Sequence, residues 1–236
     1  MITLHHLEYS QSFRILWLLE ELGVEYKLEL YERDPKTFLA PAQYKALSPI
    51  GTAPVITDGD LVLSESNAIV DYILDKYPDN KLRPAAGSTH RARYLFWLHA
   101  GQGSVTPLLL MNMIFGVISK RAPFFVKPII RPILSLALDS FATPRMKKIL
   151  QKAEADLEQA PWFGGDVLSA ADIVLSYTLL ATNERGYITQ DHPRCKEWLE
   201  RIETLPSFQS ARKKDGKPSV ISVSYTHLTL PTIYSV

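Results

Sequence analysis

Length, composition and charge set the first limits on this chain. Its 236 residues exceed the about 150 residues typical of one domain, so the length suggests two domains. Hydrophobic residues make up 46% of the sequence and charged residues 22%, which is enough apolar material for a packed interior and favours a folded chain over a disordered one. The net charge of +1 excludes a general attraction to nucleic acid or to anionic lipid.

The cysteine and histidine content narrows the chemistry. A single cysteine, Cys195, excludes an internal disulfide framework, a CxxC redox pair and a zinc site built from several cysteines, and it is interpreted as a packed or incidental thiol. His5 and His6 are neighbours on an expected strand, where their rings face opposite sides, so no metal site is expected. The N-terminus lacks the pattern of a secretory signal, and a cytoplasmic protein is expected.

The first 80 residues alternate strand and helix patterns. Residues 2–7 predict a strand, residues 12–22 a helix that ends at Gly23, and residues 26–31 a second strand with alternating apolar and charged side chains. Two parallel strands need such a helical crossover, so these elements predict a βαβ unit.

Two short apolar runs follow this unit. Residues 54–57 and 61–63 are joined by Asp58-Gly59-Asp60, which predicts a hairpin, and a helix over residues 66–77 is ended by Pro78. The order β-α-β-α-β-β-α over residues 1–80 predicts an α/β domain of the thioredoxin-like class.

The rest of the chain predicts an all-α C-terminal domain. Residues 81–89 are rich in turn formers and are expected to be a linker. The domain at 90–215 is expected to contain helices at 90–119, 125–139, 144–159, 170–183 and 194–204. Residues 105–119 carry no charge, but this run is too short and too interrupted to span a membrane, so a buried helix is expected and membrane contact is not.

Two further local patterns concern structure. Ser169 and Asp172 form an S-x-x-D capping box before an apolar run, which assigns Asp172 to folding and not to catalysis. Residues 219–236 contain no Asp, Glu, Lys or Arg, and the string SVSYTHLTLPTI is similar to translated cloning sequence. Residues 216–236 are therefore expected to be a non-native or disordered tail, the alternative being a genuine β-prone segment.

Three segments resemble the cytosolic glutathione transferases. They are SQSFRILWLLEEL at the first helix, SPIGTAPVITDGDLVLSESNAIVDYI across the hairpin and GGDVLSAADIVLSY in the helical domain, within a resemblance that covers residues 2–213. The likeness is closest to the fungal and bacterial branch with a serine in the first turn. It implies glutathione as a co-substrate, no permanently bound cofactor, a role in detoxification and a homodimer.

The resemblance also implies roles for individual residues. Ser10 becomes the catalytic residue that holds the glutathione sulfur as a thiolate, with Ser12 or Tyr9 as alternatives. Ser66 begins a helix, where free amides and the helix dipole favour an anion, so it is expected to bind the γ-glutamyl carboxylate. Glu65 is expected to take the ammonium group. The alternatives are a plain helix cap for Ser66 and a solvated acid for Glu65.

The proline turn is expected to bind the middle of glutathione. By resemblance, the peptide bond between Ala53 and Pro54 is cis and the main chain of Val55 meets the cysteinyl unit; a trans proline at a strand start is the alternative. Thr52 stands where many relatives have lysine, and Ser48 replaces a common asparagine. Lys45 and Gln43 are therefore the candidates for the glycyl end.

The second substrate is expected to be a hydrophobic electrophile. A pocket for it is predicted from side chains at helical spacing together with the first turn: Tyr9, Tyr94, Trp97, Leu98 and Gly101. Aromatic residues at that spacing also suit a helical core.

Two classes of function compete. The first is a transferase that attacks electrophilic carbon or reduces peroxides with glutathione. The second is a non-catalytic glutathione-binding or protein-interaction module on the same scaffold, which fold alone cannot distinguish. A thiol-disulfide reductase is disfavoured because position 10 is serine.

Overall fold

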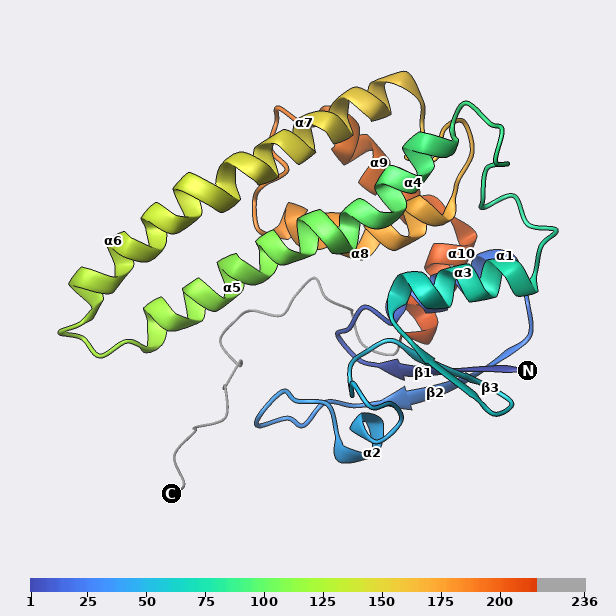
Figure 1. The fold of residues 1–236 in the computed structure, drawn as a ribbon, viewed down its shortest axis with the longest axis horizontal. Helices are drawn as coiled ribbons and strands as arrows, with labels where there is room; N and C mark the ends of the chain where they lie inside the picture. Colours follow the sequence, from blue (N-terminus) through green and yellow to red (C-terminus); the bar gives the residue numbers. More distant parts are fainter. Residues whose placement is uncertain (216–236) are drawn as a thin grey trace. The chain divides into compact units, whose positions relative to one another are not determined.

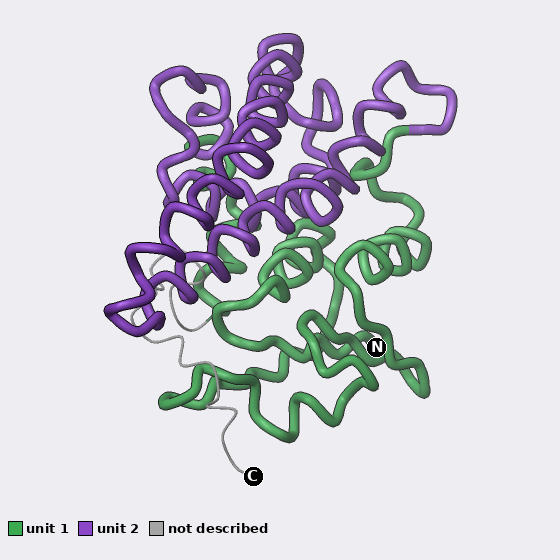
Figure 2. The backbone as a smooth tube through the Cα atoms, turned by 60° about the vertical axis from the view of Figure 1, so that its left-hand side comes forward, with its two compact units in different colours: residues 1–84, 200–236 green, residues 85–199 purple. Residues whose placement is uncertain are grey.

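A computed structural model describes residues 1–215, which form two compact units (Figure 2). Within the described chain, unit 1 contains residues 1–84 and 200–215, and unit 2 contains residues 85–199. The expected tail at 216–236 lies outside the described residues.

Unit 1 contains a four-stranded mixed sheet. Its strands are β1 (Ile2–Leu7), β2 (Tyr26–Tyr31), β3 (Val55–Asp58) and β4 (Leu61–Ser64), in the order β2-β1-β3-β4. The β1 and β2 strands are parallel, whereas β3 is antiparallel to both β1 and β4. This arrangement confirms the thioredoxin-like fold, and the first two strands have the predicted limits.

Four helices pack with this sheet. They are α1 (Phe13–Leu22), α2 (Ala42–Lys45), α3 (Ser66–Lys76) and α10 (Pro206–Lys214). Figure 1 shows α1, α3 and α10 on one face of the sheet and α2 on the other. Gly23 ends α1 with a left-handed φ of 63°, the conformation that favours glycine at a helix end.

The α10 helix was not predicted, and it packs against α1. The ring of Phe208 makes edge contacts with Phe13 and Trp17, with centroids 5.4 and 5.0 Å apart. The indole N–H of Trp17 donates a 3.0 Å hydrogen bond to Ser207 Oγ. Residues 200–215 therefore group with the sheet, whereas the sequence placed them in the helical domain.

Unit 2 is helical throughout. Its elements are α4 (Arg91–Ala100), α5 (Thr106–Arg121), α6 (Lys127–Ala137), α7 (Thr143–Gln159), α8 (Ala170–Glu184) and the start of α9 (Pro193–Thr204). Wider π-helical turns at Gly101–Val105 and Leu138–Ala142 join α4 to α5 and α6 to α7. The sequence missed both turns, and it separated α6 from α7 although they are continuous.

The α8 helix forms the centre of unit 2. Asp172 is fully buried and accepts hydrogen bonds from the N–H groups of Ser169 and Phe163, at 3.0 and 2.8 Å, and from the Trp198 indole at 2.9 Å. The predicted capping box with Ser169 is present. The Phe163 ring lies between Trp97 and Trp198, with centroids 4.7 and 5.2 Å away.

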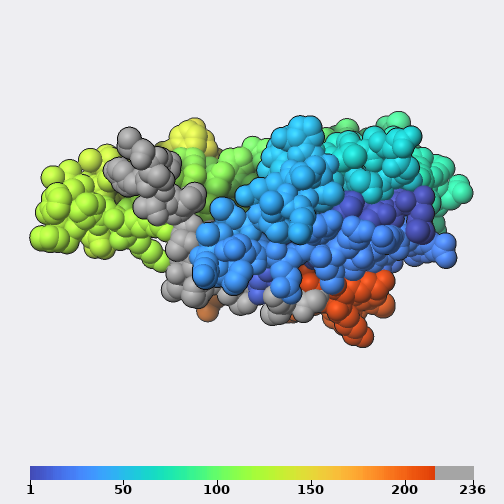
Figure 3. All heavy atoms as spheres, turned by 90° about the horizontal axis from the view of Figure 1, so that it is seen from below, coloured from blue at the N-terminus to red at the C-terminus, as the bar shows by residue number. Residues whose placement is uncertain are grey.

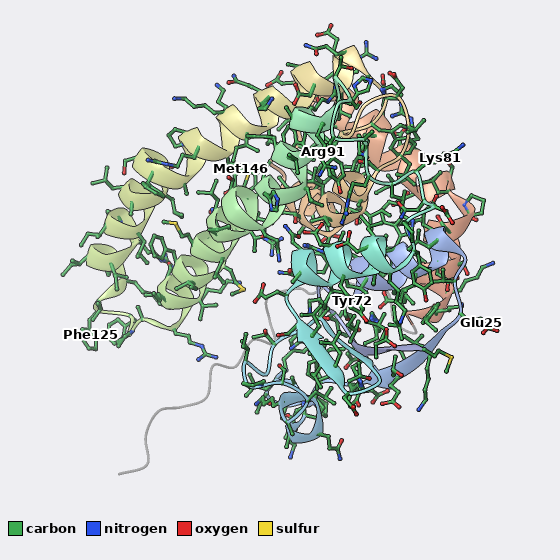
Figure 4. The ribbon with its side chains drawn as sticks, turned by 45° about the vertical axis from the view of Figure 1, so that its right-hand side comes forward. Glu25, Tyr72, Lys81, Arg91, Phe125 and Met146 are labelled. Carbon is green, nitrogen blue, oxygen red and sulfur yellow. The ribbon has the colours of Figure 1, made fainter. Side chains whose placement is uncertain are left out.

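The α5 and α6 helices expose much of their apolar surface. Only Leu108 and Leu109 of α5 are buried, and no α6 residue is. The expectation of a buried helix is therefore wrong for most of α5. By length and composition alone, residues 91–121 could cross a membrane. Figure 3 shows α5 and α6 as a yellow-green lobe, and Figure 4 shows Phe125 at its tip.

Candidate active site

Three turns meet at one edge of the sheet in unit 1. Strand register places His5 beside Val55 and Val55 beside Ser64. Because β3 runs antiparallel to both neighbours, the end of β1, the start of β3 and the end of β4 lie at the same edge. The turns that carry Ser10, Pro54 and Glu65 therefore converge there.

Ser10 lies in the turn between β1 and α1. Its hydroxyl donates to the Leu7 carbonyl at 2.7 Å, lies 2.7 Å from Ser12 Oγ and accepts from the Ser12 N–H at 3.2 Å. Helix α1 begins at Phe13 with Ser12 at its N-cap, so Ser10 stands two positions before the cap. Ser10 is 5% exposed and Ser12 is fully buried.

Tyr9 is half-buried in the same turn. Its backbone is left-handed, with φ 51°, and its ring stacks on Phe38 with centroids 5.5 Å apart. A positive φ is uncommon for a residue with a large side chain, and such outliers concentrate at functional turns. The contact with Phe38 fixes the direction of the Tyr9 ring.

Ser66 and Glu65 form the start of α3. Glu65 is exposed and occupies the N-cap with φ 78°, so the alternative that Ser66 is the N-cap is wrong. Ser66 is 1% exposed, and its Oγ has no hydrogen-bond partner among residues 1–215. A buried hydroxyl without a partner at a helix N-terminus, beside free amides, suits an anionic ligand.

The Ala53–Pro54 peptide bond is cis, as predicted. Val55 is fully buried and lies in register between His5 of β1 and Ser64 of β4. Burial raises the pKa of Tyr44, whose hydroxyl donates to the His5 carbonyl at 3.3 Å. The Val55 main chain expected to meet a ligand is thus paired within the sheet, whereas Ala53 lies before the start of β3.

The residues expected at the glycyl end lie near this turn. Lys45 and Thr52 are exposed, and Gly51 packs so close that a Cβ there would lie 3.4 Å from the Lys45 carbonyl. Ser48 is buried and accepts from the Gly51 N–H at 3.2 Å, so it shapes the loop. The end of α2 and the proline turn are therefore neighbours.

The predicted second-substrate residues of the helical domain are core residues. Tyr94, Trp97 and Leu98 are at most 2% exposed, and the Trp97 indole donates to Asp156 at 2.7 Å. A Cβ at Gly101 would lie 3.3 Å from a Leu175 methyl group. We therefore correct this pocket assignment, because the helical spacing of these residues reflects packing against α8.

Unit 2 also has an open pocket, which does not contain the residues predicted for the second substrate. The pocket, of about 860 Å³, lies between α7 and the connection from α8 to α9. None of the predicted site residues lines it.

His6 is expected from the sequence only as a strand residue, and the structure gives it partners beyond the sheet. His6 and His5 do face opposite sides: His5 lies 3.1 Å from both Tyr31 Oη and Thr57 Oγ1, and burial lowers its pKa. His6 instead lies 2.9 Å from Ser12 Oγ and 2.6 Å from a carboxylate oxygen of Asp215. No sequence signal connects residues so far apart in the chain.

Cys195 lies apart from these groups. It is buried, and burial raises the pKa of its thiol, so it remains protonated and unreactive. This agrees with the expectation of a packed thiol.

Comparison with known proteins identifies the family. Residues 10–76 match the profile "Glutathione S-transferase, N-terminal domain", and residues 135–201 match "Glutathione S-transferase, C-terminal domain". Glutathione S-transferase 3 of Schizosaccharomyces pombe is 27% identical over 91% of this chain and 88% of its own length. A probable glutathione S-transferase of Oryza sativa subsp. japonica is 30% identical over 83% of this chain and 88% of its own.

A solved structure agrees over nearly the whole length. A glutathione S-transferase from Actinobacillus pleuropneumoniae has a TM-score of 0.74 and 34% identity, covering 93% of this chain and 94% of its own. Together with the sheet topology and the convergent turns, these matches show that the chain belongs to the glutathione S-transferase family.

Proposed function

We propose that this protein is a glutathione transferase that holds the sulfur of glutathione beside Ser10 as a thiolate and transfers it to a hydrophobic electrophile. The observation that carries the proposal is the buried hydroxyl of Ser66, which has no partner in the described part of the chain and lies at the same sheet edge as Ser10. Such an arrangement suits a ligand with an anionic end and a thiol, and glutathione has both.

The γ-glutamyl end of glutathione would occupy the start of α3. Its carboxylate would accept hydrogen bonds from the Ser66 hydroxyl and from the first free amides of the helix. The exposed Glu65 carboxylate would take the ammonium group. The carboxylate and the ammonium group of the γ-glutamyl end would then each have a suitable partner, hydrogen-bond donors at Ser66 and a carboxylate at Glu65.

The rest of the peptide would follow the proline turn. We assign the cysteinyl main chain to Ala53 beside Pro54, where the backbone leaves the sheet register. The glycyl carboxylate would lie near Thr52 and the Lys45 ammonium group, a point charge that suits a carboxylate. Val55 supports this turn from within the sheet.

The Ser10 hydroxyl would stabilise the thiolate. A cysteine thiol is mostly protonated at neutral pH, and a hundredfold larger thiolate fraction requires about 2.7 kcal/mol. A hydrogen bond to a charged group supplies about 1.5–3 kcal/mol, so a single donated bond accounts for most of this requirement. Ser12 is fully buried, which favours Ser10 as the hydroxyl that meets the sulfur.

The test separates the enzyme from a binding module. Purified protein should conjugate glutathione to an activated aryl chloride and should bind glutathione in calorimetry. Binding without conjugation or reduction of an organic hydroperoxide would support the non-catalytic module. Reduction of the hydroperoxide without conjugation would assign the protein to peroxide chemistry.

The protein is further proposed to work as a homodimer in the cytoplasm, in detoxification. Support for a second copy comes from the exposed apolar side chains of α6, including Ile129 and Ile133, which water would otherwise contact. The single, buried cysteine suits a reducing compartment.

A further inference from the structure

A chain of four hydrogen-bonded side chains runs from Ser10 into unit 1. Ser10 Oγ lies 2.7 Å from Ser12 Oγ, which lies 2.9 Å from Nδ1 of His6. Nε2 of His6 lies 2.6 Å from Oδ1 of Asp215. The His6 and Asp215 side chains are each 1% exposed, so only the Ser10 end approaches the surface.

The chemistry of the four groups fixes the direction of the hydrogen bonds. A carboxylate only accepts, so Nε2 of His6 carries the proton that is donated to Asp215. In the neutral ring, Nδ1 is then an acceptor and receives the Ser12 hydroxyl proton. Ser10 in turn donates inward, to the Leu7 carbonyl or to Ser12 Oγ. In this state no hydroxyl proton of the chain points toward a ligand.

Protonation of His6 reverses this direction. With a proton on Nδ1, His6 donates a hydrogen bond to Ser12, and Ser12 can donate to Ser10. The Ser10 hydroxyl can then donate its own hydrogen bond to a ligand. One row of hydrogen bonds thus connects His6, which would accept the thiol proton, with Ser10, which would then stabilise the thiolate.

We propose that this row carries the thiol proton of bound glutathione to His6, which acts through Ser12 and Ser10 without touching the substrate. The proposal rests on the proposed binding of glutathione at Ser10. His6 and Asp215 are positioning residues in this scheme.

The proton transfer balances without any added reactant. The S–H bond breaks and its proton goes to Ser10 Oγ, while the original Ser10 proton moves to Ser12 Oγ and the original Ser12 proton moves to Nδ1 of His6. The products are a thiolate, two intact hydroxyls and an imidazolium. The Ser10 proton now lies between its oxygen and the sulfur, where it stabilises the negative charge.

Asp215 favours this outcome electrostatically. Its Oδ1 faces His6, and its Oδ2 has no hydrogen-bond partner among the residues that the structure describes. A buried carboxylate with so few donors is poorly stabilised. Its Oδ1 lies 2.6 Å from Nε2 of His6, so Asp215 would be the counter-ion of the imidazolium that the transfer forms.

The proposal can be tested with variants that keep the shape of the replaced side chain but interrupt proton transfer. His6→Asn keeps polar atoms near the ring positions but accepts no proton, and Ser12→Ala breaks the row in the middle. His5→Asn is the matched control, because His5 is the next residue on β1 and bonds to Tyr31 and Thr57 instead.

The measurement is the rate at which thiolate absorbance appears after rapid mixing with glutathione, in H₂O and in D₂O. We expect a solvent isotope effect in the wild type and in His5→Asn. In His6→Asn and Ser12→Ala, thiolate formation should be at least roughly tenfold slower, with the dissociation constant for glutathione within about twofold of the wild type. Added imidazole should partly restore the rate in His6→Ala.

Two outcomes would overturn the proposal. One is a wild-type rate and isotope effect in folded His6→Asn, with only a lower melting temperature, which would make His6 a structural tie to Asp215. The other, used if His6 variants do not fold, is an unchanged rate in Asp215→Asn. Ser10→Ala, measured in parallel, separates the two proposals. If thiolate is lost in Ser10→Ala but not in the His6 and Ser12 variants, the proton transfer to His6 is refuted. If the wild type does not bind glutathione, the proposed function itself is refuted.

Discussion

The hydroxyl oxygens of Ser10 and Ser12 lie 2.7 Å apart, yet only Ser10 retains exposed surface. Two serines separated by one residue therefore have different positions, Ser10 near the surface of the turn after β1 and Ser12 buried at the N-cap of α1. This difference is the basis for assigning contact with the sulfur to Ser10.

Replacing Ser10 with alanine should raise the pKa of the bound glutathione thiol, because the donated hydrogen bond is lost. Turnover at about pH 7 should fall roughly ten- to several-hundred-fold, following the relation between barrier and rate. Activity should partly return at higher pH, where the thiol ionises unaided. Thiolate absorbance against pH is the measurement, and Tyr9→Phe is the control; a shift in Tyr9→Phe but not in Ser10→Ala would transfer the role to Tyr9.

Ser66→Ala should weaken glutathione binding and leave the chemical step nearly unchanged. The proposed partner is a carboxylate whose charge is the same in the ground state and the transition state, so the interaction is uniform binding. The dissociation constant should rise about 10- to 100-fold, the equivalent of one hydrogen bond to a charged group. Ser64→Ala, two positions earlier, is the control for calorimetry and kinetics. A collapse of turnover at constant affinity would contradict the anion site.

Asp172→Ala should destabilise the protein by more than the about 0.5–2 kcal/mol of a simple cap, since each buried donor left without an acceptor costs about 1–3 kcal/mol. The structure explains the larger value, because the change leaves the buried N–H groups of Phe163 and Trp198 without their acceptor. Urea unfolding measures it, with Asp166→Ala, on the exposed surface of the same unit, as control. A loss within the range of a simple cap would mean that the surrounding donors find other partners.

Asp58 should stabilise unit 1 in a pH-dependent way. Hydrogen bonds from Lys76 and from the Tyr72 hydroxyl, the latter at 2.8 Å, lower the pKa of Asp58 from 3.8 to about 2. Tyr72 projects from α3, where it is labelled in Figure 4. Because the folded state holds the proton less tightly than the unfolded chain, this contribution is present above about pH 4 and is lost as the pH falls toward 2.

The difference in unfolding free energy between the wild type and Asp58→Asn should therefore shrink over that interval. Asp60→Asn, in the same turn, serves as the comparison. A difference that stays constant from neutral to acid pH would show that Asp58 acts through packing and not through its charge.

Ile133→Glu should convert a dimer into a monomer, since it places a charge on the apolar face of α6. Ile133 is 59% exposed and belongs to a helix without buried residues. Sedimentation measures the mass, and Arg131→Glu on the same helix controls for added negative charge. A monomeric wild type that binds anionic lipid vesicles would replace the second copy with a membrane surface.

Local sequence patterns predicted the elements whose geometry depends on neighbouring residues. Alternation fixed β2, the Asp58-Gly59-Asp60 turn fixed the hairpin between β3 and β4, and S-x-x-D fixed the start of α8. In each case the physical cause lies within a few residues: side chains that alternate between sheet faces, a turn that needs a left-handed residue, or a cap for free amides.

Features that depend on distant residues were missed or misassigned. Only Phe208 and Ala211 of α10 are buried, too few for a periodic signal, and the helix is held by α1. Tyr94 and Trp97 have a helical spacing that suits either pocket lining or core packing. Only the position of α8 shows that they belong to the core. The convergence of the turns at Ser10, Pro54 and Glu65 could be predicted because fold class determines it, whereas the partner of His6 could not.

The link between His6 and Asp215 joins residues 209 positions apart and has a consequence for synthesis of the protein. Strand β1 is translated before α10, and all of residues 85–199 must be translated between them before the helix that covers Phe13 and Trp17 exists. Until then, these rings remain open to solvent or to a chaperone. A chain released before residue 206 would keep the turns at Ser10, Pro54 and Glu65 but expose an apolar face on α1, which would mark it for aggregation or degradation.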